Sequence, residues 1–174
     1  RWYNESYPGF NISNPAIHSC KDLPNVNEMT WYAKEGDPRW DADELWTTMG
    51  HLYKGGMWFK KKSVLLTEHH YDTEKSADGS TDIRTTFMTY TNSSSSINNS
   101  GLPSAADAGN YFYLPALGFY YYGRLNNVGD RCFYWSSSAY PWLSDNAYTL
   151  YFDSGEVNVG SAYRYYGFRV GGFE

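Results

Sequence analysis

The stretch AYTLYFDSGEVNV, residues 147–159, decides how the rest of the chain is organised. Two runs of alternating apolar and polar residues flank Ser154-Gly155, and a two-residue loop that contains Gly is a strong β-hairpin signal. A hairpin closed there pairs Phe152 with Val157 and gives its strands one apolar face and one polar face. The apolar face holds Tyr148, Leu150, Phe152, Val157 and Val159, and the opposite face holds Thr149, Tyr151, Asp153, Glu156 and Asn158.

The polar face of this hairpin is unusual for a surface that meets only solvent. It combines an aromatic ring and an amide with Asp153 and Glu156, which lie opposite each other. Like charges directly across a strand pair destabilise it by a few tenths to about 1 kcal/mol. Two interpretations stay open: the face is selected for contact with a ligand, or the two carboxylates are a tolerated surface pair that salt screens.

Size and charge limit the classes of protein to which the chain can belong. Its 174 residues are the usual size of one domain, and its net charge is -5. We expect no nucleic-acid partner, because such a partner needs a basic stripe and residues 60–62 form the single basic run. No apolar run approaches the roughly 18 residues of a membrane helix, so direct membrane insertion is not expected. No signal peptide precedes Arg1, and this abrupt start predicts a processed protein or an excised domain.

Aromatic residues make up 20% of the chain, with 18 Tyr and 7 Trp. Tyr and Trp supply large, stiff, half-polar contact area at a low entropic cost. Ten of the tyrosines follow Gly118, so the enrichment belongs to the C-terminal part. Cys20 and Cys132 are the two cysteines, which excludes a disulfide framework and a four-cysteine zinc site. One bridge between them and two independent thiols remain as alternatives.

Two helices are predicted in the first third of the chain. In the first, Asn25 is the expected N-cap and Glu28 sits where a capping-box acid belongs, with Gly36 at the end. In the second, Asp41 and Glu44 form another capping pair, His51 is expected to be buried, and Lys54-Gly55-Gly56 is the end. The expected buried residues are Val26, Met29, Tyr32 and Ala33 on the first helix, and Leu45, Met49, Leu52 and Tyr53 on the second.

The remaining pattern predicts strands separated by long loops. The whole is therefore an α+β domain in which two helices pack on one side of an antiparallel β-sheet. The section from residue 63 to 103 is polar and long, and a loop of that length is usually functional or mobile. Besides the hairpin, the expected strands are an entry strand within 1–20, then 57–59, 84–90, 111–120 with Pro115 at an edge or bulge, 132–137 and 166–170.

Several short motifs in this order resemble a known family. They are Leu23-Pro24 with Glu28, Leu114-Pro115-Ala116, Tyr134-Trp135-Ser136-Ser137-Ser138, Asn146-Ala147-Tyr148 with Leu150 and Phe152, Ser154-Gly155 with Val157, and Gly167-Phe168-Arg169-Val170. The chain resembles the bacterial "major paralogous domain" group (FISUMP), which has a C-type-lectin-like fold distantly similar to formylglycine-generating enzymes. It is also similar to the variable proteins of diversity-generating retroelements. The resemblance covers most of the chain and is specific in the final forty or so residues.

This resemblance implies a binding domain whose C-terminal face is open to diversification. In retroelement systems an error-prone reverse transcriptase randomises adenines, so that Asn codons become Tyr, Ser, Asp and other codons, although Glu156 departs from that descent. Trp135 is assigned to the core. Trp142 and Leu143 follow Pro141 in a loop, where an apolar side chain is either a buried plug or an exposed anchor, and the anchor is the preferred interpretation. Together with strand alternation, the family implies ligand contacts at Tyr140, Trp142, Leu143, Asp145, Asn146, Thr149, Tyr151, Asp153, Glu156 and Asn158, and secondarily at Phe119, Tyr122, Arg124, Arg164 and Tyr165.

Catalytic and metal-binding alternatives have weaker signals. A formylglycine-generating enzyme needs a reactive cysteine pair, and Cys132 stands alone near Trp135. Adjacent histidines such as His69-His70 cannot both point inward along a strand. The acids at 72, 78 and 82 lie in a Gly/Ser loop suited to calcium, yet they lack the EF-hand spacing. We therefore expect no catalytic residue, no metal and no cofactor.

The sequence thus favours a non-enzymatic, adhesin-like binding domain of a secreted or bacterial surface protein, including a pilus tip. Its expected partner is a protein or glycan on a target cell or surface, and its oligomeric state is left open. One alternative is a carbohydrate-binding lectin with a fixed site, in which rings stack on sugars. Another is a degenerate formylglycine-generating-type enzyme.

Overall fold

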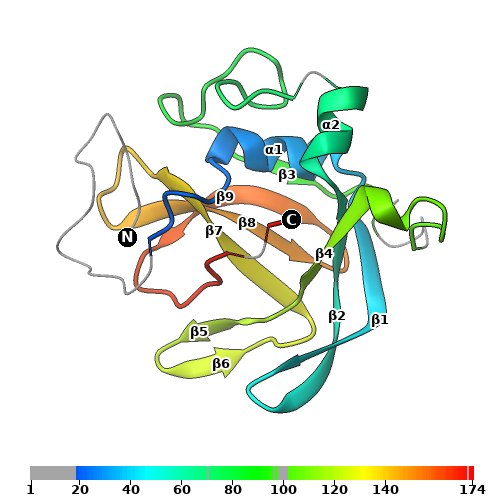
Figure 1. The fold of residues 1–174 in the computed structure, drawn as a ribbon. Coiled ribbons are helices and arrows are strands. Elements are labelled where there is room, and N and C mark those ends of the chain that lie inside the picture. Colours follow the sequence, from blue (N-terminus) through cyan, green and yellow to red (C-terminus); the bar gives the residue numbers. More distant parts are fainter. Residues whose placement is uncertain (1–18, 70, 96, 98–101, 172) are drawn as a thin grey trace.

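The computed structural model describes residues 19–69, 71–95, 97, 102–171 and 173–174, and it has an α+β architecture (Figure 1). The predicted entry strand therefore lies almost wholly outside the described residues. The elements are α1 (Val26–Glu35), β1 (Arg39–Thr48), β2 (His51–Lys60), α2 (Lys62–Glu68), β3 (Tyr90–Asn92), the 3₁₀ helix η1 (Ala108–Asn110), β4 (Tyr111–Pro115), β5 (Phe119–Tyr121), β6 (Arg124–Asn126), β7 (Arg131–Ala139), β8 (Asn146–Asp153) and β9 (Val157–Tyr163).

The strands form three antiparallel sheets. The largest has the order β3-β9-β8-β7, a second has the order β1-β2-β4, and β5 pairs with β6. Helix α1 crosses the four-stranded sheet, and its buried residues join those of β7, β8 and β9 in one hydrophobic core (Figure 1). The phenol of Tyr134 on β7 donates a 3.0 Å hydrogen bond to the carbonyl of Pro115 on β4, and this bond links two of the sheets.

The predicted C-terminal hairpin is confirmed. Strands β8 and β9 pair in the expected register, with Phe152 opposite Val157 and Leu150 opposite Val159. The five residues assigned to the apolar face are all buried, because α1 and the second sheet cover that face. The first helix is also confirmed: the Asn25 side chain accepts from Glu28 N, and the Glu28 carboxylate accepts from Asn25 N, which is a capping box.

The predicted second helix is wrong, because its residues form the β1–β2 hairpin. Met49 and Gly50, with φ of 49° and 78°, make the two-residue turn. Asp41 does accept hydrogen bonds from the main-chain N–H groups of Asp43 and Glu44, but at an irregularity in the β1 pairing instead of a helix start. The expected buried stripe is largely in solvent, since Leu45, Met49, Leu52 and His51 are exposed and Tyr53 is half-buried.

Several strand boundaries also differ from the prediction. Gly55 lies inside β2 and does not end an element; a Cβ there would stand 2.3 Å from the carbonyl oxygen of Gly129, so the close approach requires Gly. The predicted strand at 84–90 is wrong except for Tyr90, where β3 begins. Pro115 ends β4, and the 111–120 run divides into β4 and β5. The 166–170 segment is held by isolated bridges at Gly167 and Arg169 and forms no full strand.

The four-stranded sheet separates the two cysteines. Cys132 belongs to the main core, whereas Cys20 belongs to a smaller cluster with Trp135, Ala139 and Ala147 on the opposite side. Both are free thiols, so the alternative of two independent thiols is the one that the structure contains. The assignment of Trp135 to a buried cluster is confirmed. Among the described residues, no helix has both the length and the apolar character that a membrane span needs.

Candidate ligand-binding face

Five tyrosines from two distant segments meet on the surface of the protein. Tyr121 and Tyr122 come from the β5–β6 hairpin, and Tyr163, Tyr165 and Tyr166 come from the end of β9 and the turn after it. The ring centroids are 4.3 Å apart for Tyr121 and Tyr122, 5.1 Å for Tyr121 and Tyr166, and 4.8 Å for Tyr165 and Tyr166. Tyr163 stacks on Tyr165 at 5.1 Å. We call these five residues the tyrosine cluster.

Main-chain hydrogen bonds bring the two segments together. Tyr120 N donates to Gly167 O at 2.8 Å, and Gly167 N donates to Tyr120 O at 2.9 Å. On the other side of the turn, Arg164 N donates to Asp145 O, and Arg164 Nε donates to Asn146 O at 2.8 Å. Because backbone groups and one buried arginine make these bonds, the position of the two segments does not depend on the cluster side chains alone.

The turn that carries Tyr122 has an unusual residue for its geometry. Tyr122 and Gly123 connect β5 to β6 with φ of 47° and 72°, both in the left-handed region. Two-residue turns of this kind favour Asn-Gly, because an L-residue with a large side chain is strained there by about 1–2 kcal/mol. Tyr122 is 83% exposed and its ring contacts that of Tyr121, so little burial of this side chain offsets the strain.

An aromatic row continues from the tyrosine cluster across the outer face of the four-stranded sheet. Tyr166 lies 5.6 Å from Phe168, Phe168 stacks on Phe133 at 4.4 Å, and Phe133 lies 4.7 Å from Tyr151. Trp135 lies beneath it, 4.5 Å from Phe168. The tyrosine cluster therefore packs, through Tyr166, against a row of rings that are themselves packed on the sheet.

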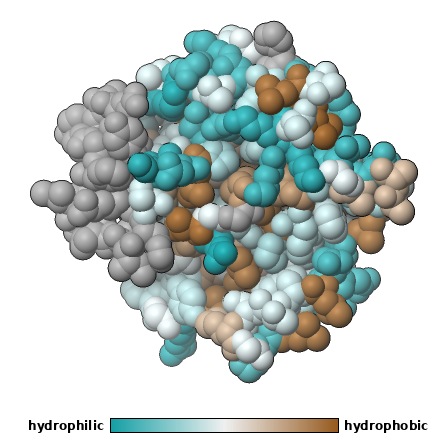
Figure 2. All heavy atoms as spheres, in the orientation of Figure 1, coloured by the Kyte–Doolittle hydropathy of each residue, from teal (hydrophilic) through white to brown (hydrophobic). Residues whose placement is uncertain are grey.

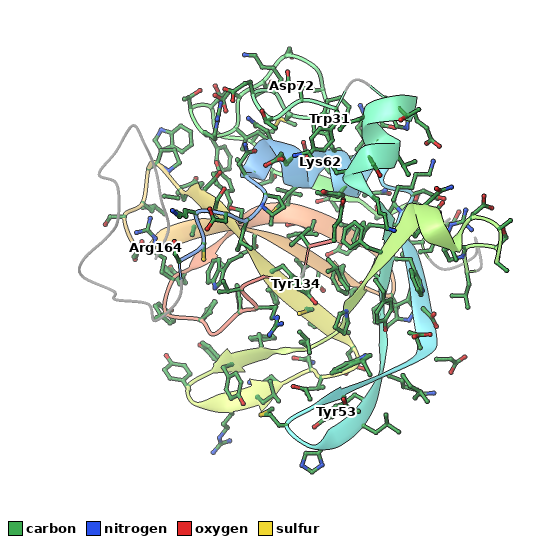
Figure 3. The ribbon with its side chains drawn as sticks, in the orientation of Figure 1. Trp31, Tyr53, Lys62, Asp72, Tyr134 and Arg164 are labelled. Carbon is green, nitrogen blue, oxygen red and sulfur yellow. The ribbon has the colours of Figure 1, made fainter. Side chains whose placement is uncertain are left out.

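Three of the predicted contact residues are buried, so their expected exposure is wrong. Thr149 is 3% exposed because it lies opposite Trp135 and Gly160 in the middle of the sheet. Asn146 and Arg164 are each 8% exposed, because they join the cluster turn to β8. Arg164 lies among the loops at one end of the sheet, and Tyr134 lies near its middle (Figure 3).

The other predicted contacts divide by exposure and do not form one patch. The half-buried ones are Tyr140, Tyr151, Asp153, Glu156, Asn158 and Phe119, and the exposed ones are Trp142, Leu143, Asp145, Tyr122, Arg124 and Tyr165. Of the exposed group, Tyr122 and Tyr165 belong to the tyrosine cluster. The sequence prediction missed Tyr121, Tyr163 and Tyr166, although two Tyr-rich runs, each followed by Gly, were a signal that could have indicated them.

Asp153 has a structural role. The repulsion between Asp153 and Glu156 is therefore no evidence that this face is selected for ligand contact. Its Oδ1 accepts hydrogen bonds from Gly155 N at 2.8 Å and Glu156 N at 3.1 Å, and its Oδ2 accepts from the Tyr151 phenol. The carboxylate therefore caps the β8–β9 turn. These three donors offset its repulsion from Glu156, so the pair gives no reason to infer a ligand.

A second aromatic group surrounds Trp142. Its ring lies 5.4 Å from Tyr140 and 6.3 Å from Phe87, and about half of the Trp142 side chain is exposed. Trp142 and Leu143 are thus on the surface, as an anchor requires. On the face that Figure 2 presents, apolar residues lie in separate spots among hydrophilic ones.

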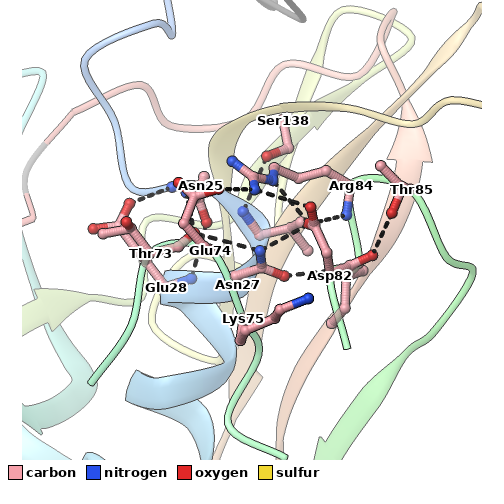
Figure 4. A network of polar contacts seen from close by, with 12 residues as sticks. Asn25, Asn27, Glu28, Thr73, Glu74, Lys75, Asp82, Arg84, Thr85 and Ser138 are labelled. Atoms are coloured by element: carbon pink, nitrogen blue, oxygen red, sulfur yellow. Dashed lines mark hydrogen bonds and ion pairs between the residues drawn. The ribbon is translucent and has the colours of Figure 1, made fainter. Parts of the chain in front are cut away.

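In the acidic loop after α2, the carboxylates of Asp78 and Asp82 accept hydrogen bonds from nearby groups of the protein. Asp78 accepts from Thr81, Ser80 and Ser76, and the bonds from Thr81 lower its pKa. Burial raises the pKa of Asp82, but hydrogen bonds from Arg84 and Asn27 outweigh it and hold this pKa below its usual value (Figure 4). Within the described part of the chain, no three His, Cys, Asp or Glu side chains gather as a metal site.

Of the two adjacent histidines, the structure describes His69, which lies beside the carboxylates of Glu35 and Glu68. His69 Nδ1 lies 3.6 Å from a carboxylate oxygen of Glu35, and His69 is half-buried. His70 lies outside the described residues.

Comparison of the chain with protein-family models, with curated proteins and with solved structures gives no match. Any assignment of function therefore depends on the residues and geometry of the binding face.

Proposed function

We propose that the chain is a non-enzymatic ligand-binding domain with a C-type-lectin-like fold, and that the tyrosine cluster is its contact surface for a protein on a target cell or surface. The observation that carries this proposal is the meeting of five tyrosines from two distant segments, with Tyr122 83% and Tyr165 60% exposed. Aromatic residues are enriched at protein interfaces, and tyrosines dominate antibody contact loops for the same reason.

The backbone at Tyr122 supports selection for contact over stability. A tyrosine at φ of 47° is strained, and Asn would fit this turn better. Strain of this kind persists where a function requires the side chain. The rings of the cluster also touch one another, so they are partly ordered before a ligand arrives. Less entropy is then lost on binding.

The arrangement also supports diversification by a retroelement. The cluster residues fall within Phe119–Phe168, and main-chain bonds, including those between Tyr120 and Gly167, position their segments. Side chains at these positions can therefore change while the scaffold persists. An imperfect repeat of this region, differing at adenines and lying beside a reverse transcriptase gene, would support this part of the proposal. Absence of both would leave an adhesin-like domain of fixed specificity. A secreted or cell-surface location belongs to the same proposal.

The experiment that tests the binding function compares two exposed sites. The whole chain is used to capture surface proteins from candidate target cells, and the captured protein is then titrated against variants. Tyr165→Ala together with Tyr122→Asn should weaken binding at least tenfold. Leu45→Ala, at a residue that is also 60% exposed but lies on the β1–β2 hairpin, should leave it unchanged. Equal loss in both variants, or none in either, would contradict the proposal.

The same protein and its variants can distinguish the proposed function from two others. The exposed rings of Tyr165 and Trp142 favour a carbohydrate-binding lectin as the second candidate, because exposed rings stack on sugar faces. Binding on a glycan array that requires Tyr165 would favour that candidate. A formylglycine-generating-type enzyme has the least support, since Cys132 is buried and burial raises the pKa of its thiol to about 12. Oxidation of a substrate peptide that depends on Cys132 would revive it.

A further inference from the structure

Arg164 is a buried residue where the two loops that carry exposed aromatic groups meet. One group is the tyrosine cluster, and Arg164 lies in its turn, directly after Tyr163 at the end of β9. The other group surrounds Trp142. Arg164 is 8% exposed, and Figure 3 places it among the loops at one end of the four-stranded sheet. We call the residues of the second group the Trp142 group: Phe87, Tyr140, Trp142 and Leu143.

The loop between β7 and β8 is tied to Arg164 through the main chain. Within this loop, Tyr140 N donates to Asn146 O at 3.3 Å, and Asn146 N donates to Leu143 O at 3.1 Å. The same Asn146 carbonyl accepts from Arg164 Nε at 2.8 Å, and Asp145 O accepts from Arg164 N at 2.8 Å. The carbonyl that closes the loop is therefore also the one that joins it to the turn of the tyrosine cluster.

A buried guanidinium at this position costs free energy, because its charge is taken out of water. Burial lowers the pKa of Arg164, and the charge of Asp145 opposes that shift only in part. An apolar side chain of similar size would avoid the cost, and replacing buried charged groups by apolar ones is often neutral or stabilising. The arginine therefore indicates a role other than stability, and its contacts point to the relative position of the two loops.

The tyrosine cluster alone is small for a stable contact between proteins. Its five rings are roughly half exposed and offer roughly 500 Å², since a Tyr side chain contributes about 150–250 Å² when it is buried. A stable interface buries about 800 Å² on each partner. The Trp142 group can supply the difference, because Phe87 is 60%, Leu143 51% and Trp142 49% exposed.

We infer that Arg164 is a positioning residue, which holds the loop of Trp142 and Leu143 against the turn of the tyrosine cluster so that both groups contact one protein ligand. The ligand rests on the proposed function, whereas the link between the loops depends only on the contacts of Arg164. Loops that are held before a ligand arrives lose less entropy on binding.

The first test is amide hydrogen exchange of the ¹⁵N-labelled whole chain without any ligand. In Arg164→Met, the amides of Asn146 and Tyr166, one in each loop, should exchange about tenfold faster than in the parent. The loss of one hydrogen bond of ordinary strength shifts a local opening equilibrium by about that factor. Amides of the β1–β2 hairpin should keep their rates. Unchanged exchange at Asn146 and Tyr166 would overturn the inference.

Two further variants control this measurement. Arg124→Met makes the same chemical change at an exposed arginine and should accelerate neither amide. Arg164→Lys keeps a donor and the charge but lacks the planar fork, so it should give an intermediate acceleration. It also carries the comparison if Arg164→Met does not fold. Equal acceleration in Arg124→Met and Arg164→Met would overturn the link between the loops.

A binding measurement separates positioning from a purely structural role. The surface protein captured by the parent chain is titrated against Trp142→Ala in two backgrounds. With Arg164 present, Trp142→Ala should weaken binding at least fivefold. In the Arg164→Met background it should weaken binding less than twofold, because the loop no longer holds Trp142 in place. Equal factors in both backgrounds, or no effect in either, would overturn the positioning role. If exchange accelerates as expected while Tyr165→Ala leaves capture intact, the proposed function fails and the link between the loops stands.

Discussion

The tyrosines of this protein occupy two contrasting environments. Tyr134 and Tyr148 lie on the inner face of the four-stranded sheet, and their phenols donate to the carbonyls of Pro115 at 3.0 Å and Ile83 at 3.1 Å. Tyr122 and Tyr165 lie on the surface and contact other rings. The same side chain therefore serves as a core residue with a satisfied hydroxyl in one region and as exposed contact area in the other.

This contrast shows that composition alone does not assign a role to tyrosine. Strand alternation accounts for the burial of Tyr134 and Tyr148, because each lies on the face that α1 or the second sheet covers. The β5–β6 turn accounts for the exposed position of Tyr122, and the main-chain hydrogen bonds of Gly167 help to position Tyr165 and Tyr166. A core tyrosine should then carry stability and an exposed one should not. The following predictions would break or sharpen that division.

The largest expected effect is on the inner face. Phe152→Ala should lower the free energy of unfolding by about 3–5 kcal/mol, because a fully buried ring next to Phe59 and Tyr134 leaves a cavity. Urea unfolding followed by circular dichroism measures the change. Leu45→Ala, at an exposed position of β1, is the control and should change stability by less than about 0.5 kcal/mol. Similar losses in both would mean that the inner face is not the main core.

The free energy of unfolding should fall at alkaline pH because of the buried tyrosines Tyr134 and Tyr148 and the thiol of Cys132. Burial raises the pKa of Cys132 from an ordinary 9.0 to about 12, and it also raises the pKa values of Tyr134 and Tyr148 above their ordinary 10.0. Below about pH 8 these groups are protonated in both states and give no pH dependence. Above it the unfolded chain loses protons that the folded protein retains, so stability falls as pH rises toward the folded-state pKa values.

These three groups together should lower the free energy of unfolding by about 4 kcal/mol between pH 8 and pH 10.5, since each contributes at most about 1.4 kcal/mol per pH unit above its unfolded pKa. Urea unfolding at four pH values between these limits measures it. Tyr148→Phe removes one such group and should make the decline shallower. A free energy of unfolding that is flat across this range would show that the buried groups ionise in the folded protein.

A smaller effect is expected at the β8–β9 turn. Asp153→Ala should cost about 1–2 kcal/mol, because the N–H groups of Gly155 and Glu156 lose their acceptor. Asp153→Asn keeps an acceptor oxygen and should cost less than half as much. The comparison uses thermal unfolding of the two variants. If both are as stable as the parent, Asp153 is not a turn cap and its interpretation as a contact residue regains its basis.

The sequence predicted the elements whose signals are local and mutually consistent. Ser154-Gly155 between alternating runs defined the C-terminal hairpin, and Asn25 with Glu28 defined the start of α1. The β1–β2 hairpin was missed because Asp41 and Glu44 imitate a helix start. In the structure Asp41 caps an irregular stretch of strand, and the turn depends on a positive φ at Met49 that sequence propensity does not indicate.

The candidate site was predicted in part, and the reason is geometric. Alternation correctly separated the two faces of β8 and β9, but it says nothing about what covers the outer face. That face is partly covered by Phe133, Trp135 and Phe168, which is why Thr149 is buried. The tyrosine cluster depends on bonds between Tyr120 and Gly167, which are distant in sequence. No local pattern could have joined them.

The smallest expected effect on stability has the opposite sign to the others and tests the outer region directly. Tyr122→Asn should raise the free energy of unfolding by up to about 1 kcal/mol, because Asn accepts the left-handed conformation that Tyr122 holds at φ of 47°. It also removes a ring that is 83% exposed. Tyr165→Ala, which relieves no backbone strain, is the matched control and should leave stability within about 0.5 kcal/mol of the parent. Urea unfolding measures both variants, and near-ultraviolet circular dichroism reports the loss of ring contacts. If Tyr122→Asn instead lowers stability by more than about 1 kcal/mol, its ring supports the fold, and the division between core and contact tyrosines fails at the residue where it is sharpest.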